Sequence, residues 1–301
     1  MSESARAFRT ADGARIAYRL WRPGAPRRTL VLIHGLASNL TRWWAFMAQT
    51  RLRERWDVLR LDLRGHGGSL WRGRVGIEVW CDDLAAILRA EGAPPAVIAG
   101  HCLGANVALW FAQRSAHASA GLVLIEPMFR EALAGTLARV AQLRPLIAPA
   151  VLALRAANAL GLYRRRLETL DLEALDREAH SGGAFPEAKY ASPWEDLKSL
   201  PSSIYLQDLL AVTGPLPGLA EIGVPSLVML SRGAALSSPQ VAARLVRPLP
   251  DLDLVQLEAR HWIPTEQPEA MRRAIDEWCE ANEARLDAAR GRSEALAAPG
   301  S

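Results

Sequence analysis

The sequence predicts an α/β fold in which a mostly parallel central sheet is flanked by helices and carries an inserted helical cap. Three observations predict it. Short apolar runs alternate with helical patterns up to residue 127, this alternation stops over residues 128–222, and it resumes over residues 223–290. Because strands that alternate with helices form parallel sheets covered on both faces, we expect a core of residues 1–127 and 223–290 and a helical cap of residues 128–222.

The strands are predicted from turn residues and short apolar runs. Asp12-Gly13 is a strong turn signal and joins two short strands into a hairpin. The later runs, such as TLVLI and GLVLI, are continuous and apolar, as expected for strands buried on both faces. The predicted strands are residues 7–10, 15–22, 29–33, 57–63, 96–99, 121–125, 226–230 and 252–257.

The helices of the core follow from apolar periodicity and from start signals. We expect helices over residues 75–89, 103–114 and 268–284, and a further helix that begins at Ser238-Pro239, an N-cap followed by proline. Residues 291–301 are expected to form a frayed tail.

Composition excludes several classes of protein. The chain has 301 residues, of which 50% are hydrophobic and 23% charged, as in an ordinary globular protein. Its three cysteines have no CxxC spacing, which argues against a disulfide framework and against a zinc site. No apolar run reaches about 18 residues, and the first residues have no signal-peptide pattern, so we expect a soluble, cytoplasmic protein. The net charge of +4 comes from scattered arginines, which argues against nucleic-acid binding.

The strongest chemical signal is the segment Gly100-His101-Cys102-Leu103-Gly104, which follows a predicted strand and opens a predicted helix. A nucleophile between two such glycines at a strand–helix turn forms a nucleophile elbow. The amino end of the helix favours a thiolate. We therefore predict Cys102 as the nucleophile, and a buried structural cysteine is the alternative.

Several segments together resemble the α/β-hydrolase superfamily, over about residues 7–285. Leu32-Ile33-His34-Gly35-Leu36 resembles its oxyanion loop, DLRGHGGS at 62–69 resembles its D-x-R-G-x-G-x-S loop, and Arg260-His261-Trp262 resembles its histidine loop. Cysteine in place of the usual serine resembles dienelactone hydrolases and polyhydroxyalkanoate synthases.

This resemblance implies roles for further residues. His261 follows the final strand and is expected to be the base for Cys102. The acid that usually follows the penultimate strand is missing, because no Asp or Glu lies between Gly223 and Pro250. Haloalkane dehalogenases instead take this acid from the end of the strand after the elbow helix. Glu126 occupies that place here, 24 residues after Cys102, and we predict it as the acid. Two alternatives stay open: Glu126 only ends its strand, or the site is a Cys–His dyad.

The remaining site residues are expected around the pocket. The backbone N–H groups of Leu36 and Leu103 should form the oxyanion hole. His34, Gly35, His101 and Trp262 belong to the motifs and are pocket candidates. Trp43 and Trp44 are candidates too, although tryptophans at this spacing are more often part of the core.

The predicted reaction is acyl transfer through a thioester on Cys102. Release to water makes the protein an esterase or thioesterase, and release to an alcohol, amine or thiol makes it an acyltransferase. A non-catalytic ligand-binding protein of the same fold is the alternative from another class. No metal or organic cofactor is implied, and the partner is expected to be a small molecule with an apolar acyl group.

The cap contains the apolar segment PLIAPAVLAL at residues 145–154 and three arginines at 164–166. Such a segment can line an acyl pocket or contact a membrane surface. Since apolar helix faces usually belong to a core, we expect the cap to pack on the core instead.

Overall fold

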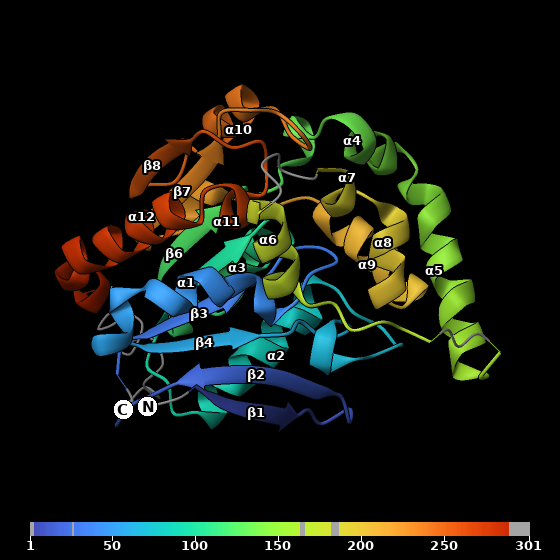
Figure 1. Ribbon diagram of the computed structural model, residues 1–301, viewed down its shortest axis with the longest axis horizontal. Coiled ribbons are helices and arrows are strands. Elements are labelled where there is room, and N and C mark those ends of the chain that lie inside the picture. Colours follow the sequence, from blue (N-terminus) through green and yellow to red (C-terminus); the bar gives the residue numbers. More distant parts are fainter. Residues whose placement is uncertain (1–2, 26, 163–165, 182–186, 289–301) are drawn as a thin grey trace.

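The computed structural model describes residues 3–25, 27–162, 166–181 and 187–288. The residues expected to form a frayed tail, 291–301, lie outside the described residues. The elements follow the predicted order, with a helical segment inserted between two halves of one sheet (Figure 1).

One eight-stranded sheet forms the centre of the molecule, in the order β1-β2-β4-β3-β5-β6-β7-β8. Strands β1 and β2 pair antiparallel as a hairpin, and β2 pairs antiparallel with β4. The six strands from β3 to β8 are parallel to one another. The strands are β1 (Ser4–Arg9), β2 (Arg15–Trp21), β3 (Thr29–Ile33), β4 (Asp57–Leu61), β5 (Ala96–His101), β6 (Ser119–Ile125), β7 (Ser226–Ser231) and β8 (Leu252–Leu257).

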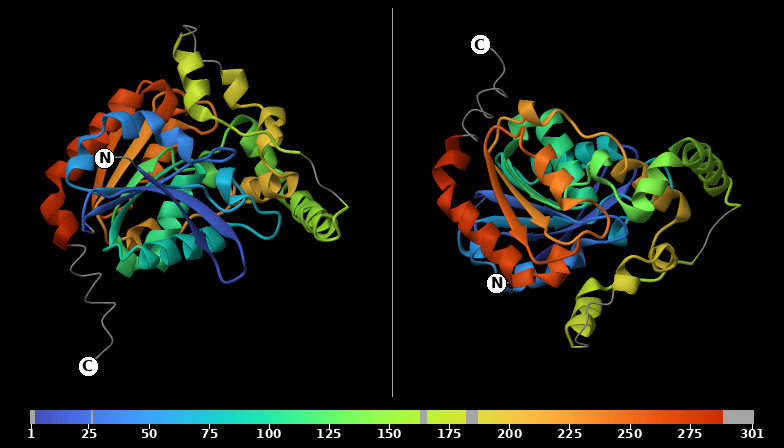
Figure 2. Two further views of the ribbon diagram at one scale, coloured as in Figure 1. Left: turned by 60° about the horizontal axis from the view of Figure 1, so that its bottom comes forward. Right: turned by 90° about the horizontal axis from the view of Figure 1, so that it is seen from above.

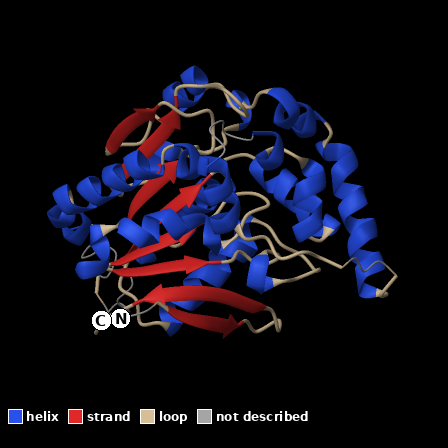
Figure 3. Ribbon diagram, viewed as in Figure 1, coloured by secondary structure: helices blue, strands red, loops and turns tan. Residues whose placement is uncertain are grey.

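The central strands are apolar throughout because both faces of the sheet are covered. Leu30 and Leu32 of β3 point into one hydrophobic cluster, and Val31 and Ile33 point into the other. Helices α1 (Trp44–Gln49) and α12 (Pro268–Ala281) belong to the first cluster, and α2 (Ile77–Ala90), α3 (Leu103–Arg114) and α10 (Pro239–Leu245) belong to the second. Figure 3 shows these helices flanking the strands.

The chain between β6 and β7 carries helices joined by loops in its described residues, without a named strand, and it forms the cap. Its helices are α4 (Gly135–Gln142), α5 (Arg144–Ala159), α6 (Leu172–Ser181), α7 (Glu187–Tyr190), α8 (Pro193–Ser199) and α9 (Ser202–Val212). They lie beyond one end of the sheet (Figures 1 and 2). A short helix, α11 (Ile263–Glu266), follows β8. Short 3-10 turns are Leu40–Trp43, Arg51–Glu54, Gly67–Ser69, Ala116–Ala118, Arg130–Ala132 and Leu219–Glu221.

The apolar cap segment was expected to pack on the core, but α5 makes its main contacts with the cap helices α9 and α4, and only along one of its sides. Val151 is buried, whereas Leu146 is 69% and Leu152 is 65% exposed. The reason is geometric, since α5 contacts α9 and α4 along one stripe only and no described element covers its outer side.

The elbow glycines are required by close packing between α3 and its neighbours. A Cβ on Gly104 would lie 2.4 Å from the carbonyl oxygen of Ile33, and a Cβ on Gly100 would lie 2.2 Å from the Gly104 backbone. Backbone atoms cannot yield as a flexible side chain does, so the amino end of α3 lies directly against the end of β3.

Gly104→Ala is therefore expected to destabilise the protein, by about 1–3 kcal/mol or more as for other overpacked sites. The measurement is the urea unfolding midpoint. Gly223→Ala is the matched control, because a Cβ there meets no atom within 4 Å. Equal midpoints for the two variants would contradict the packing argument.

Candidate active site

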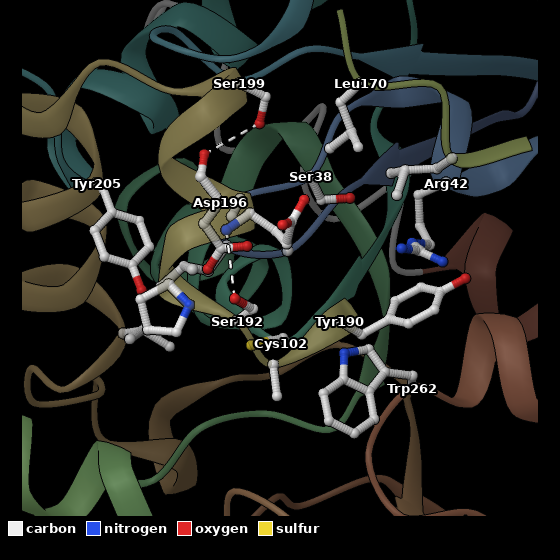
Figure 4. A pocket seen from close by; sticks show the side chains of 18 of the residues that line it. Ser38, Arg42, Cys102, Leu170, Tyr190, Ser192, Asp196, Ser199, Tyr205 and Trp262 are labelled. Atoms are coloured by element: carbon white, nitrogen blue, oxygen red, sulfur yellow. Dashed lines mark hydrogen bonds between the residues drawn. The ribbon is translucent and has the colours of Figure 1, made fainter. Parts of the chain in front are cut away.

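Cys102 lies in the turn between β5 and α3, with φ of 55° and ψ of −116°. A non-glycine residue in this region is strained by roughly 1–3 kcal/mol, and such strain is typical of nucleophile elbows. The Cys102 N–H donates to the carbonyl of Ile125 at 2.9 Å, which ties the turn to β6. The thiol lines a cavity under the cap (Figure 4).

The structure brings His261 and Glu126 to this cysteine from two other loops. The His261 ring hydrogen-bonds to Cys102 and to Glu126, and its Nδ1 lies 3.3 Å from Glu126 Oε2. The His261 and Glu126 side chains are 2% and 5% exposed. The three residues follow β5, β6 and β8, whose parallel arrangement places their carboxyl ends at one edge of the sheet.

Glu126 is held in place by β7. Its backbone has a φ of 52°, and its N–H donates to the carbonyl of Met229 at 2.9 Å. Its Oε1 accepts the backbone N–H of Ser231, while Oε2 faces His261. One carboxylate oxygen is thus fixed by the neighbouring strand and the other is directed at the imidazole.

The loop after β7, where such an acid usually lies, contributes backbone instead. The Gly233 N–H donates to the carbonyl of Ala259 at 2.9 Å, which joins this loop to the segment before His261. The nearby acid Glu258 is 76% exposed and pairs with Arg232 at 3.2 Å. Its side chain therefore points into solvent and away from the site.

Glu266 organises the histidine loop, a role that the sequence analysis did not assign. Its Oε1 accepts the backbone N–H groups of His261 at 3.1 Å and Trp262 at 2.8 Å, and it also accepts that of Arg260. Glu266 ends the short helix α11, five residues after His261. This spacing is the signal in the sequence from which its contact with the histidine loop could have been predicted. The carboxylate satisfies amides at the amino end of α11 and fixes the direction of the imidazole.

The charge on His261 follows from its partners. Burial by itself lowers the pKa of His261, but its hydrogen bonds to Cys102 and Glu126 outweigh burial and raise the pKa to about 10. The ring is therefore an imidazolium at neutral pH.

His101 and His34 have structural positions. The His101 Nε2 donates to the backbone carbonyl of His261 at 3.1 Å, and burial holds the pKa of His101 well below its usual range. His34 accepts the N–H of Leu63 at 3.0 Å with Nε2 and donates from Nδ1 to the carbonyl of Gly35 at 2.8 Å. The two rings therefore hold the loops that surround Cys102.

The loop at Gly35 adjoins the elbow directly. A Cβ on Gly35 would lie 3.3 Å from Cys102 Cβ and 3.2 Å from the His101 carbonyl oxygen. The next residue, Leu36, lines the cavity. Leu103 is the first residue of α3, and an amide in that position has no partner within its own helix. The two predicted oxyanion-hole residues thus lie next to the thiol.

The cavity has a volume of about 720 Å³, within the usual range for small-molecule sites. Its wall has an apolar part and a polar part. The apolar part includes Leu36, Leu137, Val140, Leu209, Val212 and Leu236. The polar part includes Arg42, Tyr190, Ser192, Asp196, Ser199 and Tyr205, which Figure 4 shows around Cys102.

Three predicted pocket candidates lie outside the described lining of the cavity, and this corrects the sequence analysis. Trp43 is fully buried in the core between the sheet and α1. The indole of Trp44 donates to Asp176 of the cap at 3.0 Å, which turns it away from the cavity. His34 is fully buried under the loop that it holds. Gly35, His101 and Trp262 do line the cavity.

Buried polar contacts fasten the cap to the core beside the site. Arg42, 5% exposed, pairs with Asp176 at 3.0 Å, and the Tyr190 hydroxyl donates to the same carboxylate at 2.6 Å. On the other side, His66 Nε2 and Asp208 Oδ2 lie 2.9 Å apart, and both are fully buried. These contacts join α6 and α9 to core loops, and neither contact was predicted from the sequence.

Asp196 and Tyr205 project from the cap into the cavity (Figure 4). Burial raises the pKa of Asp196 to about 7, although a hydrogen bond from the Tyr205 hydroxyl lowers it. The cap thus supplies a carboxyl group that is partly protonated near neutral pH, together with a phenol. These two groups can exchange hydrogen bonds with a polar part of a ligand.

Alkylation should distinguish Cys102 from the other two cysteines. Burial raises the pKa of Cys81 to about 12 and also raises that of Cys279, so neither is a thiolate at neutral pH. We expect brief treatment with iodoacetamide at pH 7 to modify Cys102 alone, as measured by peptide mass mapping. Comparable modification of Cys81 or Cys279 in folded protein would contradict this assignment.

Comparisons with known proteins agree with this geometry. The chain is 30% identical over 256 residues to lipase LipV of Mycobacterium tuberculosis, covering 82% of this chain and 90% of that protein. It is 26% identical to 2-(acetamidomethylene)succinate hydrolase of Mesorhizobium japonicum over 84% of this chain and 88% of that protein. The crystal structure of a hydrolase from Pseudomonas aeruginosa superposes with a TM-score of 0.66 and 25% identity, covering 90% of this chain and 97% of that one.

A family model described as the alpha/beta hydrolase fold matches residues 28–268. The match spans the elbow, the loops that converge on it and the inserted cap. The chain therefore belongs to the alpha/beta hydrolase family.

Proposed function

We propose that this protein is a cysteine-dependent hydrolase of carboxylic esters or thioesters that acts through a thioester on Cys102. The observation that carries the proposal is the His261 ring, which hydrogen-bonds to Cys102 and to Glu126 in a buried position at the edge of the cavity. Relatives named lipase and hydrolase, which match over most of this chain, support the class of reaction.

In the first step, the Cys102 thiolate attacks the carbonyl carbon of the substrate. The backbone N–H groups of Leu36 and Leu103 stabilise the oxyanion that forms, and each such donor typically contributes about 3–4 kcal/mol. The bond to the leaving group breaks as the His261 imidazolium donates its proton to that group. The products of this step are an alcohol or thiol and a thioester on Cys102.

In the second step, the neutral imidazole accepts a proton from water, and the hydroxide equivalent attacks the thioester carbonyl. The same oxyanion site holds the second tetrahedral intermediate. The carbon–sulfur bond breaks, the acid leaves, and the Cys102 thiolate and the His261 imidazolium are restored. Glu126 stabilises the imidazolium and keeps Nδ1 of the ring directed towards itself, which presents the other nitrogen to the reaction.

The cavity favours substrates with an apolar group and a polar group. The apolar wall formed by α4 and α9, with Leu137, Val140 and Leu209, suits an acyl chain. Asp196 and Tyr205 lie in the same cavity and would hydrogen-bond to the polar part of the substrate.

Intact-protein mass measurement after brief incubation with acyl esters and thioesters of increasing chain length tests the proposal. We expect a gain of one acyl group that is absent in Cys102→Ala. Glu126→Gln should prolong the life of the adduct, because the imidazole that activates water is less well oriented. Glu258→Gln, an exposed acid close to His261 in the chain, is the matched control and should behave as the parent protein does.

Two outcomes would overturn this proposal. If no donor gives an adduct and native spectra instead show retained, unmodified ligand, the protein is a ligand-binding member of the family. If the acyl group leaves only when an alcohol, amine or thiol is added, the protein is an acyltransferase.

The pH dependence of acylation gives an independent prediction. Donation of a proton to the leaving group needs the imidazolium, which persists up to its pKa of about 10. Single-turnover acylation by an alkyl thioester should therefore decline as pH rises through about 10. Glu126→Gln removes one of the groups that raise the pKa of His261, so the decline should move to lower pH. An unchanged alkaline limb in that variant would show that Glu126 has no part in setting the charge of the ring.

A further inference from the structure

Exposed large hydrophobic residues gather on and beside α5 among the described residues. Leu146 and Leu152 are 69% and 65% exposed, and Leu160 and Leu162, just after the helix, are 73% and 76% exposed. The helix packs on α9 through a stripe on its other side, where Val151 is buried and the Asn158 amide donates to Ser203 at 3.0 Å. Figures 1 and 2 show α5 on the outside of the cap, away from the sheet.

This face lies in a part of the chain that carries positive charge only. No Asp or Glu occurs between Glu131 and Glu168, whereas the same stretch contains six arginines. Arg139, at the end of α4, and Arg166 are exposed, and Arg155 lies half-buried within α5. The outward residues of α5 itself are leucine, alanine and proline.

The apolar outer face of α5, together with the arginines near it in the sequence, indicates which kind of surface could cover this face. Helices that lie in a membrane interface bury an apolar face among the acyl chains and place cationic residues near anionic headgroups. Self-association through this face would bring together two stretches of chain that carry positive charge only, which charge repulsion disfavours. A polar protein surface would leave the exposed leucines without apolar contacts.

We propose that the outer face of α5 docks on the surface of an anionic phospholipid membrane. The helix would lie in the plane of the interface, with Leu146 and Leu152 inserted and the flanking arginines at the headgroups. Within the described residues, no single helix is long and apolar enough to cross a membrane, and α4 with α5 meets those criteria only as a pair bent by 76°. Since α9 lies directly under α5 and lines the cavity, the docked surface would be next to the cavity wall.

Co-sedimentation of the full chain with vesicles tests this inference. The vesicles are phosphatidylcholine alone, or phosphatidylcholine with 30% phosphatidylglycerol. We expect binding to the anionic vesicles that weakens with added salt, and much weaker binding to the neutral ones. Using Cys102→Ala protein throughout removes any effect of lipid turnover, so that failure of docking and failure of the proposed chemistry stay distinguishable.

Two sets of variants locate the contact. Leu146→Asp with Leu152→Asp should lower the vesicle affinity roughly tenfold or more, and its unfolding midpoint should stay unchanged because both side chains are exposed. Leu70→Asp is the matched control, since Leu70 is 51% exposed and lies outside the cap. Arg139→Gln with Arg166→Gln should weaken binding to anionic vesicles alone and reduce its dependence on salt.

Three results would overturn the inference. The first is no vesicle binding at low salt, and the second is equal binding by the parent protein and the double leucine variant. The third is self-association without vesicles that rises with protein concentration and is absent in the double leucine variant.

Discussion

The close approach of α3 to the end of β3 is the constraint on which the rest of the site depends. Gly104 has no room for a side chain against the carbonyl of Ile33, so the amino end of the helix lies directly against the sheet. This contact forces the strained backbone of Cys102, presents the amide of Leu103 and places the loop at Gly35 beside the thiol. The strain at one residue is offset by the packing of an entire helix and sheet.

The position of Glu126 shows that in a parallel sheet the acid that contacts the histidine can follow either of two neighbouring strands. Loops that follow neighbouring parallel strands meet at the same edge, so an acid after β6 reaches His261 as well as an acid after β7 would. Strand β7 does not provide the acid, but it fixes the acid that β6 provides. The backbone N–H of Ser231 in β7 donates to the Glu126 carboxylate. A buried carboxylate needs such partners, since an unpaired charge in this position is costly.

The cap combines polar attachment with two apolar surfaces. Arg42 with Asp176, and His66 with Asp208, join it to the core through buried pairs whose geometry permits few arrangements. Its inner apolar surface forms part of the cavity wall, and its outer apolar surface on α5 remains uncovered. The same helical layer thus separates the cavity from the surroundings of the protein.

Local patterns in the sequence determined the strand order along the chain, the elbow, the histidine loop and the place of the cap. Each depends on residues that are close in sequence, such as the paired glycines around Cys102 or the apolar run before Glu126. The approach of Glu126 to His261 could also be predicted, because the position of this acid is defined relative to one strand and no Asp or Glu lies between Gly223 and Pro250.

Only the tertiary structure decided which side chains from distant segments meet. The contact of Glu126 with Ser231, the attachment of Arg42 to Asp176 and the burial of Trp43 each join residues that lie far apart in the chain. An apolar helix likewise has the same pattern whether its second face is covered or exposed, so the uncovered face of α5 could not be predicted from periodicity. Packing between elements brings Cys102 and Glu126 to His261, and these partners set the charge of the ring. The same packing sets the shape of the cavity.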